Sequence, residues 1–286
     1  MNDNGTAAGN ATKYAAGIGV GYRAVRWDAS GTIPTELGNL GTDAISGYTY
    51  AIAYALNDAG TAVGYAYKVV SGSGQRAVRW DASGTAATEL GSLGTNANGF
   101  ALAAAYAVNG SGTAVGYSEK YVAGSNKGNR AVRLDSSGTA ATEPGNLGTD
   151  SSGVTSAIAT ALNDGGTTVG WSLKYTAGSS LGQRAVRWDA SGTAATELGS
   201  LGTSAGGATF GNAYAVNGGG TVVGISRKFV AGKNVGDRAV RWDATGTAAT
   251  KLGNLGTDAS GTSNSSAYAV DDAGAAVGYS TAKRLN

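Results

Sequence analysis

The phrase Arg76-Ala-Val-Arg-Trp80 decides the expected fold, because it recurs along the whole chain. Four copies keep the sequence Arg-Ala-Val-Arg-Trp, and one copy ends in Leu134 instead of Trp. The copies begin at Arg23, Arg76, Arg130, Arg184 and Arg238, so they return every 53 or 54 residues. A fixed period of this length indicates repeated supersecondary units that pack against their neighbours.

Each repeat offers four extended segments with no helical periodicity. We call them a (AYAV type, as at 105–108), b (GTAVGYS type, as at 112–118), c (RAVRW type, as at 76–80) and d (TAATEL type, as at 85–90). Turn sequences of the Asn-Asp-Ala-Gly and Asp-Ala-Ser-Gly types join a to b and c to d, which predicts antiparallel hairpins. Four antiparallel strands per repeat predict an all-β fold, a five-bladed β-propeller. A β-solenoid and a six-bladed ring are the alternatives.

A tight turn between c and d would place Trp27 opposite Ile33 and Arg23 opposite Leu37. Val25, Trp27, Ile33 and Leu37 would then share the core face, because alternate strand residues point the same way. The opposite face would hold cross-strand ion pairs. The expected pairs are Arg26 with Glu36, Arg79 with Glu89, Arg133 with Glu143 and Arg187 with Glu197, while Lys251 faces Arg241 in the last repeat.

The ends of the chain predict a composite blade within a single repeat domain of residues 1–286. Segments a, c and d occur five times, whereas b occurs six times, first near 6–9 and last near 275–279. The C-terminal segment a at 267–270 would complete the N-terminal c and d. One terminal copy of b would then be displaced, either disordered or paired with another molecule. Met1 lies inside a repeat, so we expect the chain to be a piece of a longer protein.

Composition excludes several classes of function. The chain has 21 Lys and Arg against 19 Asp and Glu, so a basic surface for nucleic acid is not expected. It has no Cys and no His. Thiols and imidazoles are therefore not available as nucleophiles, as general bases or as metal ligands. No run of 18 apolar residues and no signal peptide is visible, so membrane insertion is not expected. We expect no catalytic residues, no cofactor and no metal site, and we read the Asp28 series as turn residues.

The phrases RAVRWDASGTAATELGSLGT and AYAVNGSGTAVGYS together resemble the bacterial extracellular HAF repeat family. The resemblance covers essentially the whole chain, although Arg-Ala-Val stands where the family has His-Ala-Phe. It implies secretion or surface display and a repeat-built β architecture. The order of turn, Gly-ended strand and hairpin is also similar to kelch blades, by analogy.

Aromatic residues beside lysines are the candidate ligand or partner contacts. Tyr14, Tyr121, Tyr175 and Phe229 are expected in a long loop between b and c, next to Lys13, Lys120, Lys174 and Lys228. Loop aromatics beside cations can stack on sugar rings or cover a blade edge. The leading hypothesis is a non-catalytic extracellular scaffold or binding module. The alternatives are a glycan-binding lectin and a filament subunit that self-associates through a terminal strand.

Overall fold

The computed structural model describes residues 1–69, 74–138 and 140–281, and in these ranges the regular structure is entirely β-strand. Contacts divide the chain into two units, residues 1–143 and 144–286, and each is described by itself. The single-domain interpretation stays a prediction.

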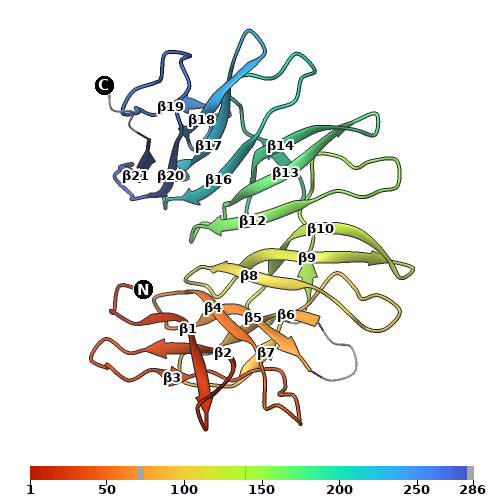
Figure 1. Cartoon of the computed structure of the whole chain (residues 1–286), viewed down its shortest axis with the longest axis vertical. Coiled ribbons are helices and arrows are strands. Elements are labelled where there is room, and N and C mark those ends of the chain that lie inside the picture. Colours follow the sequence, from red (N-terminus) through yellow and green to blue (C-terminus); the bar gives the residue numbers. More distant parts are fainter. Residues whose placement is uncertain (70–73, 139, 282–286) are drawn as a thin grey trace. The chain divides into compact units, whose positions relative to one another are not determined.

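The first unit holds one three-stranded and two four-stranded antiparallel sheets, with strands in chain order (Figure 1). The three-stranded sheet contains β1 (Ala7–Ala15), β2 (Ile18–Trp27) and β3 (Thr35–Glu36). The next contains β4 (Ala51–Leu56), β5 (Ala62–Lys68), β6 (Gly74–Trp80) and β7 (Ala87–Glu89). The last contains β8 (Ala103–Val108), β9 (Ala114–Val122), β10 (Ser125–Leu134) and β11 (Ala141–Thr142).

The second unit holds two four-stranded sheets and one hairpin. The first sheet contains β12 (Ala157–Leu162), β13 (Thr168–Thr176), β14 (Ser179–Trp188) and β15 (Ala195–Glu197). The second contains β16 (Gly211–Val216), β17 (Val222–Val230), β18 (Lys233–Trp242) and β19 (Thr250–Lys251). The hairpin contains β20 (Ser265–Val270) and β21 (Ala276–Ser280). The all-β class with four antiparallel strands per repeat is therefore confirmed, and the number of blades stays a prediction.

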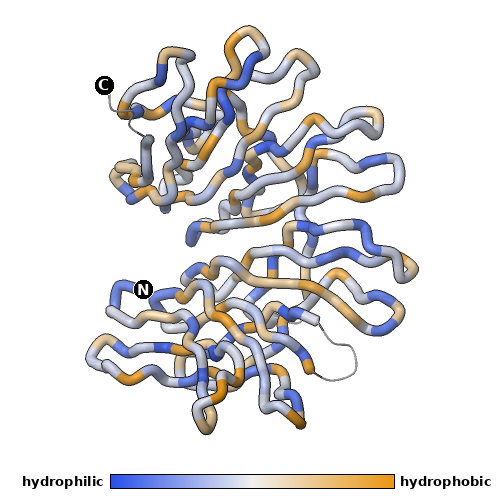
Figure 2. Tube along the Cα trace, viewed as in Figure 1, coloured by the Kyte–Doolittle hydropathy of each residue, from blue (hydrophilic) through white to orange (hydrophobic). Residues whose placement is uncertain are grey.

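Both faces of each central strand are buried, which is why short apolar side chains dominate the sequence. Ala77 and Val78 are adjacent in β6, point to opposite faces and are both fully buried. They belong to two different apolar clusters, one against each neighbouring sheet. Hydrophobic and hydrophilic positions consequently change every few residues along the chain (Figure 2).

The register between segments c and d corrects the expected faces. Val25 lies opposite Glu36, and Leu37 donates its backbone N–H to the carbonyl of Ala24. The connection between the two strands is one residue longer than in the expected tight hairpin, and residues 32–34 lie outside the strands. A shift of one residue moves side chains to the other face. Glu36 consequently shares a face with Val25. Ile33 lies outside the strands and is 82% exposed instead of buried, whereas Leu37 is fully buried as expected.

The same register corrects the expected ion pairs. In four repeats the first Arg of the phrase, not the second, binds the glutamate of segment d, because Arg76 and Val78 share a face with Glu89. Arg76 Nε lies 3.0 Å from Glu89 Oε1, and Lys68 Nζ lies 2.8 Å from Oε2. The pairs Arg23–Glu36, Arg130–Glu143 and Arg184–Glu197 repeat this arrangement. The second Arg instead lies within 4 Å of the following Asp in three repeats, as Arg79 does with Asp81 at 2.9 Å.

The expected long loop between b and c is wrong. In four repeats both segments continue as strands and meet in a two-residue turn, as at Ala123 and Gly124. Both turn residues have positive φ, 48° and 76°, which is the backbone of a type I′ hairpin turn. Polar residues such as those at 119–121 fit this long hairpin because it is only partly covered by neighbours.

Every strand of segment a contains a β-bulge. In β4 the ladder passes from Ala53 to Ala55, so Tyr54 has no partner residue in β5. A bulge bends its strand and turns the side chain of the extra residue. The backbone of β4 comes so close to Gly64 that a Cβ there would collide with the carbonyl oxygen of Ile52. The same collision at Gly116, Gly170, Gly224 and Gly278 explains the Gly in the five segments b that pair with a segment a.

Asparagine side chains connect the a–b turn of one repeat to that of the next. Asn57 accepts the N–H of Thr61 through Oδ1 and donates from Nδ2 to the carbonyl of Asn109, at 2.8 Å. The described chain also contains the links Asn2 to Asn57, Asn163 to Asn217 and Asn217 to Asp271.

Both terminal copies of segment b have a partner strand. β1 pairs with β2, and β21 pairs with β20. Neither copy is disordered, because each forms a hairpin with the segment next to it in sequence. Pairing of a terminal copy with another molecule stays a prediction. A composite blade made from both ends stays a prediction.

Candidate functional site

A pocket of about 340 Å³ lies in the first unit, where the chain after β3 returns beside the end of β5. We call it the tyrosine pocket. Tyr48 and Tyr67 remain 46% and 40% exposed, so ring faces are accessible to a ligand. The lining residues are Asp43, Tyr48, Thr49, Tyr50, Tyr67 and Val69.

The backbone of the tyrosine pocket is fixed by a tight turn and by a backbone hydrogen bond to β5. Asp43 Oδ1 accepts hydrogen bonds from the backbone N–H and the hydroxyl of Ser46, both at 2.7 Å. The Ser46 hydroxyl, with backbone N–H groups of Ser46 and Ile45, lowers the pKa of Asp43, so this carboxylate is ionised near neutral pH. Tyr67 donates its N–H to the carbonyl of Tyr50 at 2.8 Å, which joins the turn to β5.

The pocket is one end of a larger group of rings, which we call the tyrosine cluster. Tyr50 stacks on Tyr65 with centroids 5.8 Å apart, and Tyr54 meets Tyr106 edge to face at 5.2 Å. Stacked and edge-to-face pairs at such separations are favourable. The cluster contains Tyr22, Tyr50, Tyr54, Tyr65, Tyr67, Tyr106 and Tyr117.

Burial favours the neutral form of four phenols in the cluster. It raises the pKa of Tyr54, Tyr65, Tyr106 and Tyr117 above the usual value of a phenol. Neighbouring phenols add to the increase for all four, because a second negative charge would repel the first. These four side chains therefore present ring faces and neutral hydroxyl groups, which can stack on a ligand and exchange hydrogen bonds with it.

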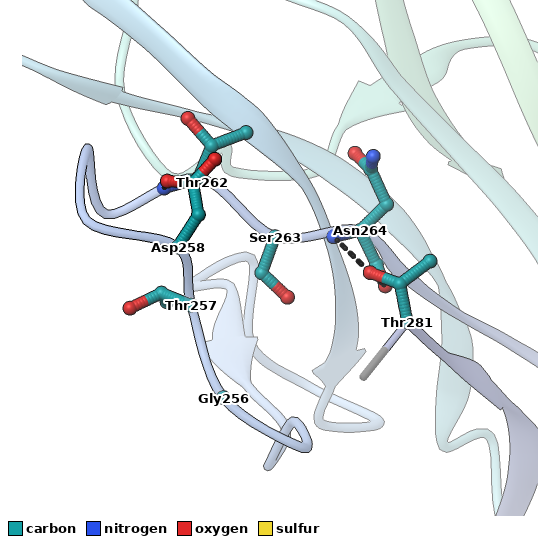
Figure 3. A pocket seen from close by; sticks show the side chains of 7 residues that line it. All are labelled: Gly256, Thr257, Asp258, Thr262, Ser263, Asn264 and Thr281. Atoms are coloured by element: carbon teal, nitrogen blue, oxygen red, sulfur yellow. Dashed lines mark hydrogen bonds between the residues drawn. The ribbon is translucent and has the colours of Figure 1, made fainter. Parts of the chain in front are cut away.

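The last repeat forms the equivalent pocket with different chemistry (Figure 3). Asp258 again closes the turn, and Thr281 donates its N–H to the carbonyl of Asn264 at 2.8 Å, as Tyr67 does to Tyr50. Thr262, Asn264 and Thr281 occupy the places of Tyr48, Tyr50 and Tyr67. This pocket of about 200 Å³ is therefore lined by hydroxyl and amide groups instead of rings.

The aromatic residues singled out from sequence lie on strands, each on its own sheet. Tyr14 near the end of β1 is 67% exposed, whereas Tyr121, Tyr175 and Phe229 are half-buried on β9, β13 and β17. The latter three lie against Gly94, Gly148 and Gly202 of the connection that follows segment d. Tyr121 also donates its hydroxyl to Glu119 at 2.7 Å. The structure does not gather these residues into one pocket, and a binding role for them stays a prediction.

The lysines next to these aromatic residues are mostly engaged in ion pairs. Lys120 Nζ lies 2.7 Å from Glu143, and Lys174 Nζ lies 2.6 Å from Glu197. Lys13 pairs with Glu36 in the same way. Lys228 differs, because the residue at the glutamate position of its repeat is Lys251.

Sequence reasoning missed the tyrosine pocket and the tyrosine cluster. The available signal was the unusual density of Tyr between residues 48 and 67, including the AYAV-type phrase, which places Tyr54 on the bulge. Without the bulge, alternation alone does not show that rings from segments a and b meet.

The described residues contain no group of three or more acidic side chains placed to hold a metal ion. Across the same residues, no helix long and apolar enough to cross a membrane is found.

Comparison with known proteins gives remote structural likeness only. No family model matches the sequence, and no curated protein matches it. Among solved structures, the chain is similar to a putative TolB from Agrobacterium tumefaciens, at 12% identity over 92% of this chain and 84% of that one, with a TM-score of 0.43. It is also similar to XC5397 from Xanthomonas campestris, a gluconolactonase, at 16% identity over 90% of this chain and 75% of that one, with a TM-score of 0.31.

Proposed function

We propose that this chain is a non-catalytic binding module and that its first repeat binds a sugar ring in the tyrosine pocket. The observation that supports the proposal is the exposure of Tyr48 and Tyr67 around a cavity of about 340 Å³ with an ionised Asp43 at its edge. Aromatic faces stack on the C–H faces of a sugar, and phenol hydroxyls or a carboxylate accept its O–H groups.

The non-catalytic part of the proposal rests on the residue inventory. The chain has neither His nor Cys, and Asp43 is already bonded to its own turn. A carboxylate with a lowered pKa is a poor proton donor near neutral pH. We place the module outside the cell, as its resemblance to HAF repeats implies.

A glycan array with the purified chain tests the proposal. Tyr67→Ala should abolish binding of the glycans that the unmodified chain retains, since a stacking face is lost. Tyr14→Ala is the matched control, because Tyr14 is more exposed than Tyr67 and does not line the pocket. The proposal is wrong if no glycan binds, or if Tyr67→Ala binds as well as the unmodified chain. Loss of binding in Tyr121→Ala alone would assign recognition to the residues on β9, β13 and β17.

A second candidate function is self-association through a terminal strand. β21 pairs with β20 in a two-stranded sheet, and Val277 and Tyr279 on it are largely exposed. A strand with an apolar exposed surface and an unpaired edge can add to the sheet of another molecule. Light scattering tests this: we expect concentration-dependent assembly that Val277→Lys prevents. A single species at all concentrations would contradict it.

A further inference from the structure

The last repeat has a cationic site where the other repeats have an ion pair. In β14 and β15 of the second unit, Val186 lies opposite Glu197, and Glu197 binds Arg184 at 3.0 Å and Lys174 at 2.6 Å. The carboxylate thus contributes one oxygen to the lysine of segment b and the other to the arginine of segment c.

The backbone of the next sheet is the same, but the carboxylate is replaced. Val240 lies opposite Lys251 as Val186 lies opposite Glu197. The hairpin of β17 and β18 keeps the same pairing and the same bulge, so Lys228 occupies the position of Lys174. Arg238, Lys228 and Lys251 therefore occupy the positions of Arg184, Lys174 and Glu197.

The arginine of this site is buried and incompletely paired. Arg238 is only 2% exposed. Its Nη2 donates to the carbonyls of Val235 and Gly261 at 2.9 and 3.1 Å, and its Nη1 donates to the backbone carbonyls of Asp237 and Ser263. Within residues 1–69, 74–138 and 140–281, no hydrogen bond or ion pair is recorded for Arg238 Nε, Lys228 Nζ or Lys251 Nζ. In the other four repeats, the equivalent Nε faces a glutamate oxygen.

Nearby carboxylates already have other partners. Asp237 lies 2.8 Å from Arg227 Nε. Asp258 Oδ1 accepts hydrogen bonds from the N–H and hydroxyl of Ser260 and from the N–H of Thr262. Replacing a glutamate by lysine thus changes the charge of the three-residue group from +1 to +3. The carboxylate of Asp237, which favours the charged form of Arg238, is shared with Arg227. Buried charge without a counter-charge is unfavourable, and guanidinium and ammonium groups together suit a compact oxyanion.

We propose that Arg238, Lys228 and Lys251 form an oxyanion site that takes a sulfate or phosphate group. The group occupies the position of the missing glutamate carboxylate, with one oxygen toward Arg238 Nε and others toward the two lysines. The source of the group is a free ion or an ester on a polysaccharide. The site lies in the second unit, so it is independent of the tyrosine pocket.

Titration calorimetry with sodium sulfate and with sodium phosphate, at constant ionic strength set by chloride, tests this site. We expect the unmodified chain to bind one ion. Lys251→Glu restores the residue found in the other repeats, so it should abolish binding and raise the melting temperature in the absence of sulfate by about 2 °C or more. Lys251→Met should weaken binding by about tenfold, because one charge-assisted hydrogen bond is lost.

Glu197→Lys is the matched gain-of-site variant, since it places a third cation beside Arg184 and Lys174. We expect it to bind two ions per chain. Heparin and desulfated heparin identify the source: tighter binding of heparin than of inorganic sulfate points to a sulfate ester, and equal binding points to the free ion. The site is refuted if the unmodified chain binds neither ion, or if Lys251→Glu and Lys251→Met bind sulfate as well as the unmodified chain.

Discussion

Trp80 Nε1 donates a hydrogen bond of 2.9 Å to the carbonyl oxygen of Gly38, 42 positions earlier in the chain. The contact joins segment c of one sheet to the end of segment d of the preceding sheet. Trp242 and Gly199 repeat it within the second unit, at 2.9 Å. The tryptophan of the repeated phrase thus both fills the space between sheets and fixes their alignment.

Removing the indole N–H should weaken this connection. We expect Trp80→Phe to lower the free energy of unfolding by about 1–3 kcal/mol beyond the loss of apolar contact, since a buried carbonyl loses its partner. Urea unfolding measures the change. Trp27→Phe is the control, because Trp27 is only half-buried and should lose less. Equal losses for the two variants would show that the hydrogen bond contributes nothing.

The two kinds of ion pair should differ in strength. Arg76 is almost fully buried against Glu89, whereas the partner of Arg79, Asp81, is mostly exposed. We expect Glu89→Gln to cost about 1–3 kcal/mol, because it leaves a buried guanidinium without counter-charge. Asp81→Asn should cost less than about 1 kcal/mol. Urea unfolding of both variants at pH 7 measures the two losses in free energy of unfolding. A larger loss for Asp81→Asn would show that the pair of Arg79 with Asp81 is the stronger one.

The bulge predicts a strict requirement for glycine. A Cβ at Gly64 would meet the carbonyl oxygen of Ile52, whereas a Cβ at Gly84 meets nothing within 4 Å. We expect Gly64→Ala to destabilise the protein by several kcal/mol, of the order of 3 or more, and Gly84→Ala to change stability by less than about 1 kcal/mol. Thermal unfolding separates the two outcomes. Similar melting temperatures would mean that β4 can move away from β5.

The tyrosine cluster predicts a loss of stability at high pH. Folding raises the pKa of Tyr65, Tyr106 and Tyr117, so the unfolded chain ionises first. Their contribution is fully present below about pH 10 and falls as pH rises from there toward the folded values. Urea unfolding between pH 9 and 12 should show this decline (about the range in which phenols ionise). The Tyr106→Phe, Tyr117→Phe double variant should decline less steeply. An unchanged slope would exclude these two phenols as its cause.

The b–c turn offers a stabilising substitution. Ala123 has φ of 48°, a conformation that disfavours side chains with a Cβ but is tolerated by Asn. Asn-Gly is the preferred pair for this turn, so Ala123→Asn should raise the free energy of unfolding by about 0.5–1 kcal/mol. Ala97→Asn, at an exposed turn position without positive φ, should have little effect in the same urea titration. Equal effects would remove the conformational explanation.

The repeat period and the turn residues were sufficient to predict the strands, their order and their antiparallel pairing. They were not sufficient for the c–d register, since one residue outside the strands, near Pro34, reverses the face of Glu36. The Lys and Tyr residues at 119–121 suggested a loop because polar composition is shared by loops and by exposed hairpins. The tyrosine pocket depends on contacts between segments, and the tyrosine cluster depends also on the bulge at Tyr54. Neither feature leaves a local pattern in the sequence.

The side chain of Asn217 donates to the carbonyl of residue 271, but that residue is an aspartate where the preceding turns have Asn. A carboxylate has no N–H, so Asp271 accepts this contact and cannot donate the next one. The links within each unit consequently run in one direction, from the earlier turn to the later one, and those of the second unit end at Asp271. New repeats should therefore be inserted before this aspartate when the protein is lengthened. A repeat added after Asp271 would not receive the side-chain amide hydrogen bond that the other turns receive.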